Sequence, residues 1–165
     1  MFFNDGVVIK PSKFGKGLFA NKNFEKGEII CLATGKFLTF KETLLLGESE
    51  SHSLQIEKDK YILCEPPFLY SNHSCHPNSA LTKDLQFYAL KNIDEGEEFF
   101  WDYSTSMLER HWTMKCNCGN RDCRKIITDF DLLLKDIQNK YLQWNIVLPF
   151  IVCELNNKGL IEHRA

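Results

Sequence analysis

Short apolar runs separated by polar turns dominate the first 100 residues of this 165-residue chain. The clearest runs cover residues 7–9, 29–32, 61–64 and 85–90. They are rich in β-branched and aromatic residues and are bounded by Gly, Pro, Asn or Asp, as strands are. No helical pattern alternates with them. The pattern therefore predicts a β-rich α+β domain of short strands, without βαβ units.

Two turns share one sequence pattern. Residues 20–28 read ANKNFEKGE and residues 89–97 read ALKNIDEGE, and each precedes a strand-like segment. In each turn a glycine, Gly27 or Gly96, can supply a positive φ. One turn type used twice explains the likeness, so we infer no duplicated domain. Between them, residues 34–60 alternate weakly and predict an irregular insert with short strands or one helical turn.

The pattern changes to helical spacing after residue 125. Apolar residues at three- and four-residue steps predict one amphipathic helix with Thr128 or Asp129 as its N-cap; they are Ile126, Phe130, Leu133, Leu134, Ile137 and Tyr141. A second short helix is expected to start near Pro149 and to stop at Gly159. We place a helical extension at 129–165. Its stripe is expected to pack against the domain, the alternatives being a lid or a dimer contact.

The composition is that of one globular domain in a reducing compartment. Hydrophobic residues make up 44% and charged residues 25% of the chain, and the formal net charge is -2. This charge gives no reason to expect direct nucleic acid binding. No secretory signal or stretch of ~20 apolar residues is visible, so we expect no membrane association and an intracellular location. Seven cysteines are too few for a disulfide scaffold of this length.

A cysteine run suggests a structural zinc site. Cys116, Cys118 and Cys123 form a C-x-C-x4-C pattern, which brings three sulfurs together along one loop. A closed tetrahedral Zn²⁺ site needs a fourth ligand. Cys75 is the nearest motif-like donor, and the competing donors are His73, His76 and His111. The alternative is a set of free loop thiols.

Two further motifs carry candidate chemistry. Residues 72–78 read NHSCHPN, which by itself is compatible with a surface turn. Residues 96–103 read GEEFFWDY, which is compatible with a turn and an aromatic core strand. Tyr103, at the end of that strand, is either a functional phenol or an ordinary half-buried tyrosine.

Taken in order, these motifs resemble the SET domain of protein lysine methyltransferases. The order is a Gly15-Lys16-Gly17 element, then the NHSCHPN motif, then the segment 96–103 with its GEE start and its Asp102-Tyr103 end, and last the cysteine run. The resemblance covers about residues 5–128. It implies a SET domain at 5–105 and a post-SET zinc-binding segment at 106–128. The implied fold is a set of small curled sheets with a knot-like crossing, followed here by C-terminal helices.

The resemblance also implies roles for individual residues. S-adenosyl-L-methionine is expected to bind on one face, and a protein or peptide lysine, such as one in a histone tail, to enter from the other. The cofactor-binding residues expected from the motifs are Phe14, Gly15, Lys16, Gly17, Asn72, His73, Tyr103 and Asn117. Tyr103 matches the catalytic tyrosine. The zinc ligands implied are Cys75, Cys116, Cys118 and Cys123.

Two positions depart from the family pattern and are assigned to the substrate channel. Many members carry an Arg-Phe pair where this chain has Leu69-Tyr70. The residue two before the catalytic tyrosine is usually Phe or Tyr, and here it is Trp101. The bulk of Trp101 suggests a tight pocket and a bias towards low methylation states. The alternative to an enzyme is a catalytically inactive, zinc-stabilised SET-like module that binds proteins.

Overall fold

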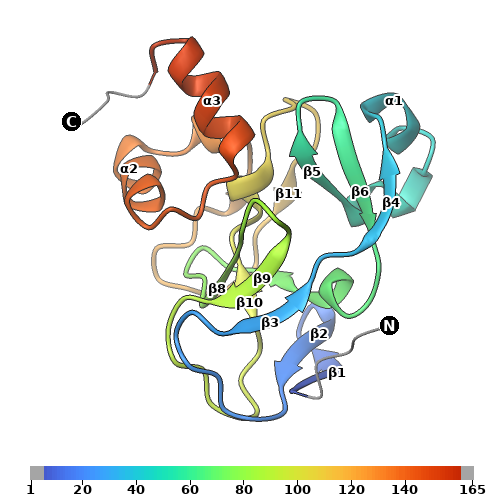
Figure 1. Cartoon of the computed structure of the whole chain (residues 1–165), viewed down its shortest axis with the longest axis vertical. Coiled ribbons are helices and arrows are strands. Elements are labelled where there is room, and N and C mark those ends of the chain that lie inside the picture. The colour runs from blue at the N-terminus through green and yellow to red at the C-terminus, as the bar shows by residue number, and fades with distance from the viewer. Residues whose placement is uncertain (1–5, 161–165) are drawn as a thin grey trace.

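Small separate sheets, rather than one large sheet, make up the fold (Figure 1). The computed structural model describes residues 6–160. Three antiparallel groups contain most of the strands: β1 (Val7–Ser12) with β2 (Gly15–Ala20), β3 (Ile29–Leu32) with β9 (Gln86–Ala89) and β8 (Ser79–Leu81), and β4 (Gly35–Leu38) with β6 (Lys60–Cys64) and β5 (Ser53–Glu57). The predicted β-rich α+β class is confirmed.

Short helical turns connect these sheets. The insert at 34–60 contains β4, the one-turn helix α1 (Phe40–Thr43), a 3-10 turn at Gly47–His52, and β5, in line with the irregular segment expected there. Further 3-10 turns cover Phe68–Tyr70, Tyr103–Ser106 and Phe130–Leu132. No helix within residues 6–160 is long and apolar enough to cross a membrane.

The two similar turns pair with each other. Phe24 and Ile93 exchange backbone hydrogen bonds of 2.9 Å in both directions. The Lys26 N–H donates to Asn92 Oδ1 at 3.0 Å, and the equivalent N–H of Glu95 donates to Asn23 Oδ1 at 2.9 Å. The repeated sequence is therefore a matched pair of turns that brings strands β3 and β10 (Phe100–Trp101) to one core.

A parallel crossing builds the centre of the molecule. β10 pairs in parallel with β7 (Asn72–His73), although the two are far apart in the chain. Asn78 holds the crossing, because its side chain donates to the Glu98 carbonyl at 2.9 Å and accepts from the Phe100 N–H at 2.8 Å. The NHSCHPN segment and the strand leading to Tyr103 therefore lie side by side.

The C-terminal region corrects one expectation. The helix predicted from Thr128 or Asp129 begins only at Lys135, as α2 (Lys135–Gln143). Ile126 is held in β12 (Ile126–Ile127) by pairing with β11 (Met114–Lys115), and the Asp129 carboxylate accepts from the Arg110 N–H instead of capping a helix. The predicted second helix is confirmed as α3 (Pro149–Asn157), with Gly159 at φ +64°.

The two C-terminal helices pack against the sheets. The main core surrounds fully buried Phe24, Phe87 and Phe99 between the small sheets. A second cluster buries Phe130, Tyr141 and Ile151. Leu134, expected in the apolar stripe, is 74% exposed because the chain is still extended there. The stripe thus belongs to a packed core, apart from Leu134 and Ile126.

Candidate functional site

Four cysteine sulfurs meet at one point, as predicted. The Sγ atoms of Cys75, Cys116, Cys118 and Cys123 all lie within 4.8 Å of one another, and those of Cys75 and Cys116 are 3.7 Å apart. A tetrahedron with Zn–S bonds of about 2.3 Å has sulfur–sulfur edges of about 3.8 Å. The four thiols therefore fit a single zinc ion. His73, the competing donor closest to Cys75, has its Nε2 3.5 Å from the Cys75 sulfur.

N–H groups surround these sulfurs. The backbone N–H of Arg124 donates to Cys75 Sγ at 3.5 Å, and that of Lys125 donates to Cys123 Sγ at 3.4 Å. The Asn120 amide donates to Cys118 Sγ at 3.2 Å. Such donors stabilise thiolates, the form in which cysteine binds a metal. This second layer of contacts supports the fit to a metal.

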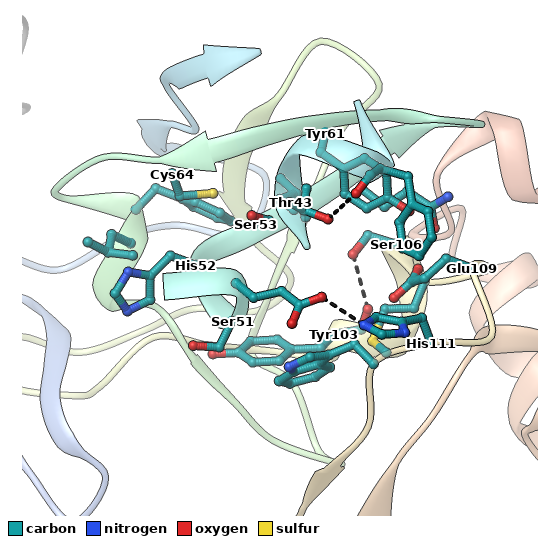
Figure 2. Close-up of a pocket in the computed structure, with 18 of the residues that line it drawn as sticks. Thr43, Ser51, His52, Ser53, Tyr61, Cys64, Tyr103, Ser106, Glu109 and His111 are labelled. Atoms are coloured by element: carbon teal, nitrogen blue, oxygen red, sulfur yellow. Dashed lines mark hydrogen bonds and ion pairs between the residues drawn. The ribbon is translucent and has the colours of Figure 1, made fainter. Parts of the chain in front are cut away.

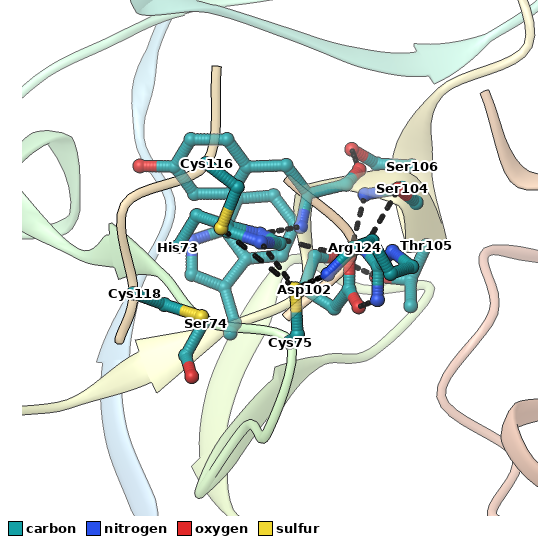
Figure 3. A network of polar contacts seen from close by, with 12 residues as sticks. His73, Ser74, Cys75, Asp102, Ser104, Thr105, Ser106, Cys116, Cys118 and Arg124 are labelled. Atoms are coloured by element: carbon teal, nitrogen blue, oxygen red, sulfur yellow. Dashed lines mark hydrogen bonds and ion pairs between the residues drawn. The ribbon is translucent and has the colours of Figure 1, made fainter. Parts of the chain in front are cut away.

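A buried ion pair ties the cysteine loop to the strand that ends at Tyr103 (Figure 3). Asp102, 1% exposed, accepts two hydrogen bonds from the Arg124 guanidinium at 2.6 and 2.7 Å and one from the Tyr141 hydroxyl at 2.8 Å. Burial works to lower the pKa of Arg124, but Asp102 more than offsets this and raises it. The guanidinium therefore stays charged. The cysteine loop, β10 and α2 all meet at one carboxylate.

A cavity of about 590 Å³ lies between the β1–β2 hairpin and the cysteine loop. This volume is within the ~300–1,000 Å³ typical of small-molecule sites. Six of the predicted cofactor-binding residues line it: Phe14, Lys16, Asn72, His73, Tyr103 and Asn117. Two of the cysteines, Cys116 and Cys118, line it as well. The cysteine loop therefore forms one wall of this cavity.

The predicted residues Gly15 and Gly17 lie in β2 of the hairpin and do not line the cavity themselves. Gly15 adopts φ +99° in the hairpin, a backbone conformation that glycine tolerates. At Gly17, a Cβ would lie 2.3 Å from Oε1 of Glu98. That carboxylate accepts from the Asn72 amide at 2.7 Å, and the same amide donates to the Lys16 carbonyl at 2.9 Å. Gly17 therefore makes room for the carboxylate that orients Asn72.

Tyr103 lies where this cavity meets a narrower one of about 80 Å³ (Figure 2). Its side chain lines both cavities, and its hydroxyl donates to the Ser71 carbonyl at 2.9 Å. Burial raises the pKa of Tyr103 far above its usual range. The phenol is therefore neutral and available for hydrogen bonding at physiological pH.

Aromatic side chains form the inner walls of the narrow cavity. Trp101 and Tyr103 lie with ring centroids 4.8 Å apart, and Phe68 lies 5.6 Å from Trp101. The Trp101 indole N–H donates to the Ser71 carbonyl at 3.3 Å. Trp101, which we assigned to the substrate channel, thus lines the narrow cavity. Tyr70, which we assigned to the same channel, lines the larger cavity, where the Lys16 amine lies 5.3 Å from its ring.

His73 is buried behind Tyr103 and is neutral. Burial lowers its pKa to about 4, and the Tyr103 backbone N–H donates to its Nδ1 at 3.3 Å. Its position beside both Cys75 and Tyr103 links the cysteine cluster to the junction of the two cavities. Its side chain therefore positions neighbours as well as lining the larger cavity.

Sequence reasoning missed several residues that build this site. Asp102 and Arg124 adjoin motif residues but gave no sign that they pair across the fold. Glu98 was noted only as part of a turn, and Tyr141 only as part of an apolar stripe. Glu109 was not noticed at all, although it lines the narrow cavity. The one signal in the sequence was that charged residues, Asp102 and Arg124, lie within or directly after the motifs.

The chain is similar in sequence to several known proteins. The chain is 30% identical over 89% of its length to a variant-silencing SET domain-containing protein of Plasmodium falciparum (isolate 3D7). It is 25% identical over 73% of its length to histone-lysine N-methyltransferase 2B of Homo sapiens, and 27% identical over 72% to histone-lysine N-methyltransferase ASHH3 of Arabidopsis thaliana. The chain spans only 8%, 5% and 37% of these relatives, respectively.

A solved structure shows the same fold. It is the humanized mutant of the Chaetomium thermophilum Polycomb Repressive Complex 2 bound to the inhibitor GSK126, with a TM-score of 0.54 and 23% identity. The similarity covers 61% of this chain and 15% of that one. Residues 15–104, more than half of the chain, match the family model described as SET domain. With the small sheets, the β7–β10 crossing and the cysteine cluster in place, the chain belongs to the SET domain family.

Proposed function

We propose that this chain transfers a methyl group from S-adenosylmethionine to the side-chain amine of a lysine in a protein. The observation that carries the proposal is the position of Tyr103, which lines a cofactor-sized cavity and a narrow aromatic cavity at once. Two reactants entering from opposite sides would meet beside its hydroxyl. Relatives named histone-lysine N-methyltransferases support a protein substrate such as a histone tail, and with it an intracellular role.

The residues of the larger cavity fit S-adenosylmethionine. Asn72, held by Glu98 and by the Lys16 carbonyl, presents a fixed polar group, while Phe14 and Tyr70 offer aromatic surface. Asn117, in the cysteine loop, forms part of the opposite wall. When bound, the cofactor supplies a methyl group already activated on a positively charged sulfur. Little chemistry is then left for the protein beyond alignment and exclusion of water.

The residues of the narrow cavity supply that alignment. Trp101, Phe68 and Tyr103 give one part of this cavity of about 80 Å³ an aromatic lining. An amine in such an apolar environment has a lowered pKa and loses its proton to solvent more easily. The Tyr103 hydroxyl and the Ser71 carbonyl lie together at the junction, where they can orient a lysine nitrogen. Tyr103 is the proposed catalytic residue.

Zinc has a structural part in this proposal. Cys75 lies directly after β7, whereas the other three cysteines lie in the loop that closes the larger cavity. A zinc ion held by all four would fix that loop against the NHSCHPN segment. Asn117, between Cys116 and Cys118, would then be held in the cavity wall. No step of methyl transfer needs the metal.

The test compares the wild type with Tyr103→Phe in transfer of a tritiated methyl group to histones and to a cell lysate. We expect wild-type incorporation and a loss on the order of 100-fold in the variant, because the phenol orients the reacting nitrogen. Tyr88→Phe is the matched control, since Tyr88 is half-buried and lines neither cavity.

Two results would contradict the proposal. Equal incorporation by Tyr103→Phe and the wild type would remove Tyr103 from the catalytic role. No incorporation on any protein, with no heat of cofactor binding in calorimetry, would favour the zinc-stabilised binding module instead.

A further inference from the structure

One end of the narrow cavity carries a set of groups that methyl transfer does not use. Tyr61, Glu109 and His111 lie together there, opposite Cys64 and His52 (Figure 2). Phe40 completes the group, with ring centroids 5.9 Å from Tyr61 and 5.4 Å from His111. We call Phe40, Tyr61, Glu109 and His111 the Tyr61 end of the cavity. It combines aromatic faces with a carboxylate.

The Glu109 carboxylate has no cationic partner. No Lys, Arg or His of residues 6–160 lies within ion-pair distance of it, whereas Glu50, the other carboxylate in the cavity, pairs with His111 at 2.8 Å. Among the described residues that line the cavity there is no Lys or Arg at all. The Glu109 carboxylate accepts from the Leu108 N–H at 3.3 Å, and the backbone N–H groups of Glu109 and Trp112 also work to lower its pKa. Glu109 is therefore a half-buried acid at the edge of a cavity, without a counter-ion.

The surroundings of Glu109 also favour an incoming positive charge. Burial, and then the nearby charge of Asp129, raises the pKa of Glu109 to about 7. Asp129 itself faces Arg110, whose backbone N–H and guanidinium Nε lie 2.7 and 3.5 Å from its carboxylate. That arginine is thus already engaged by other acids. A cation placed beside Glu109 would relieve the repulsion between the two carboxylates.

We propose that the Tyr61 end binds a cationic side chain of the substrate, an arginine above all, that flanks the acceptor lysine. A guanidinium stacks on aromatic faces and pairs with a carboxylate in two-point geometry, and it loses water more readily than an ammonium group does. The proposal rests on the proposed function, because Tyr103 marks the acceptor lysine's place in the same cavity. It adds a substrate feature: a basic residue close to the target lysine.

The test uses peptides with one acceptor lysine and one neighbouring residue that is either arginine or citrulline, its uncharged isostere. The arginine or the citrulline is placed in turn at each of the three positions on either side of the lysine. Methylation kinetics and peptide affinity are both measured. At one position or more, we expect the arginine peptide to have a KM and a Kd about tenfold lower than the citrulline peptide, with kcat little changed.

Glu109→Gln identifies the site. It should remove the difference in KM and Kd between the arginine and citrulline peptides. Glu48→Gln is the control, because Glu48 is exposed in the insert at 34–60 and does not line the cavity. A Glu109→Gln variant that keeps the full preference overturns the assignment to this end of the cavity.

The outcomes separate this inference from the proposed function. Equal affinity of the wild type for arginine and citrulline peptides at every position overturns the inference, whether or not methylation occurs. If the protein binds arginine peptides more tightly but methylates no peptide, the result supports the cation site and contradicts the proposed methyltransferase function. Methylation with an arginine preference that depends on Glu109 supports both.

Discussion

At the junction of the two cavities, the Ser71 carbonyl accepts hydrogen bonds from both the Tyr103 phenol and the Trp101 indole. These two bonds fix the rings that line the narrow cavity. Because Trp101 is 5% exposed and its ring packs 5.6 Å from Phe68, it has little room to move aside. The free space at this end of the narrow cavity is therefore limited by the Trp101 side chain.

The first prediction at this scale concerns the number of methyl groups added. The wild type should produce mostly mono- and dimethyl-lysine. The indole occupies the space that a methylated amine needs in order to rotate its lone pair back towards the methyl donor. Trp101→Phe, which is smaller and lacks the bond to Ser71, should shift the products towards trimethyl-lysine in mass spectra. Trp144→Phe is the control, since Trp144 is 45% exposed and lines neither cavity. Mostly trimethyl-lysine from the wild type would contradict the prediction.

A second residue-scale prediction concerns stability and pH at Glu109. Its pKa rises from an ordinary 4.5 to about 7 in the folded protein, so folding favours the protonated form. Its contribution to stability is present below pH 4.5 and is lost as the pH rises through 7. Glu109→Gln should therefore be more stable than the wild type at pH 8, by about 1–3 kcal/mol, with a smaller difference at pH 5.

Urea unfolding at both pH values, with zinc present, measures this difference. The charged or titratable groups around Glu109 are Glu50, Tyr61, Arg110, His111 and Asp129. These groups are the same in both proteins, so the difference between the two free energies of unfolding reports on Glu109 alone. A difference between the proteins that does not change with pH would show that Glu109 is ionised without penalty.

At the scale of elements, Asp102 joins parts that are distant in sequence. It lies after β10, pairs with Arg124 beyond the cysteine loop, and accepts from Tyr141 in α2. The Arg124 side chain is 11% exposed and that of Asp102 is fully buried. Helix α2 is therefore connected to the residue that joins β10 to Tyr103, and not only to the surface of the domain.

Breaking this connection should be costly. Arg124→Met leaves the Asp102 carboxylate buried without its cation, so we expect the free energy of unfolding to fall by about 3–5 kcal/mol. Asp102→Asn combined with Arg124→Met should recover part of the loss, because no buried charge remains. Arg121→Met, at an exposed position in the same loop, should have little effect. Denaturant unfolding that finds Arg124→Met as stable as Arg121→Met would rule out this role.

At the scale of the whole molecule, the cysteine cluster, whose geometry fits a zinc ion, adjoins the larger cavity. Cys75 comes from the NHSCHPN segment and the other three cysteines from a loop that forms a wall of the larger cavity. The hairpin reaches the same loop from the other side, through a 2.8 Å hydrogen bond from the Lys13 amine to the Cys118 carbonyl. The cavity is thus closed by three segments that meet only after folding.

Removal of the metal should open this cavity. Chelation of zinc, or Cys118→Ser, should weaken S-adenosylmethionine binding at least about tenfold in calorimetry and lower the melting temperature, because the loop loses its anchor. Cys153→Ser should change neither, since Cys153 is exposed on α3 and outside the cluster. Unchanged affinity for S-adenosylmethionine after complete zinc removal would show that the metal-anchored loop does not contribute to cofactor binding.

The amino-acid sequence by itself determined the local features of this protein. Alternating short runs gave short strands, Pro149 and Gly159 marked the ends of α3, and three clustered cysteines with Cys75 indicated a metal site. The strands and the ends of α3 depend on chemistry within a few residues, namely backbone conformation and capping, and the metal site was indicated by the type and spacing of its ligands. The family motifs extended this to Tyr103, Asn72 and the β1–β2 hairpin, which line the larger cavity.

Only the tertiary structure decided which distant groups meet. The late start of α2, the pairing of Asp102 with Arg124, the place of Tyr70 in the larger cavity, and the unpaired carboxylate of Glu109 all follow from contacts between segments far apart in the chain. A pattern of residue types carries no information on such distances. The physical reason is that a buried charge or ring is placed by the packing of several elements at once, whereas a turn or a helix end depends on its own neighbours.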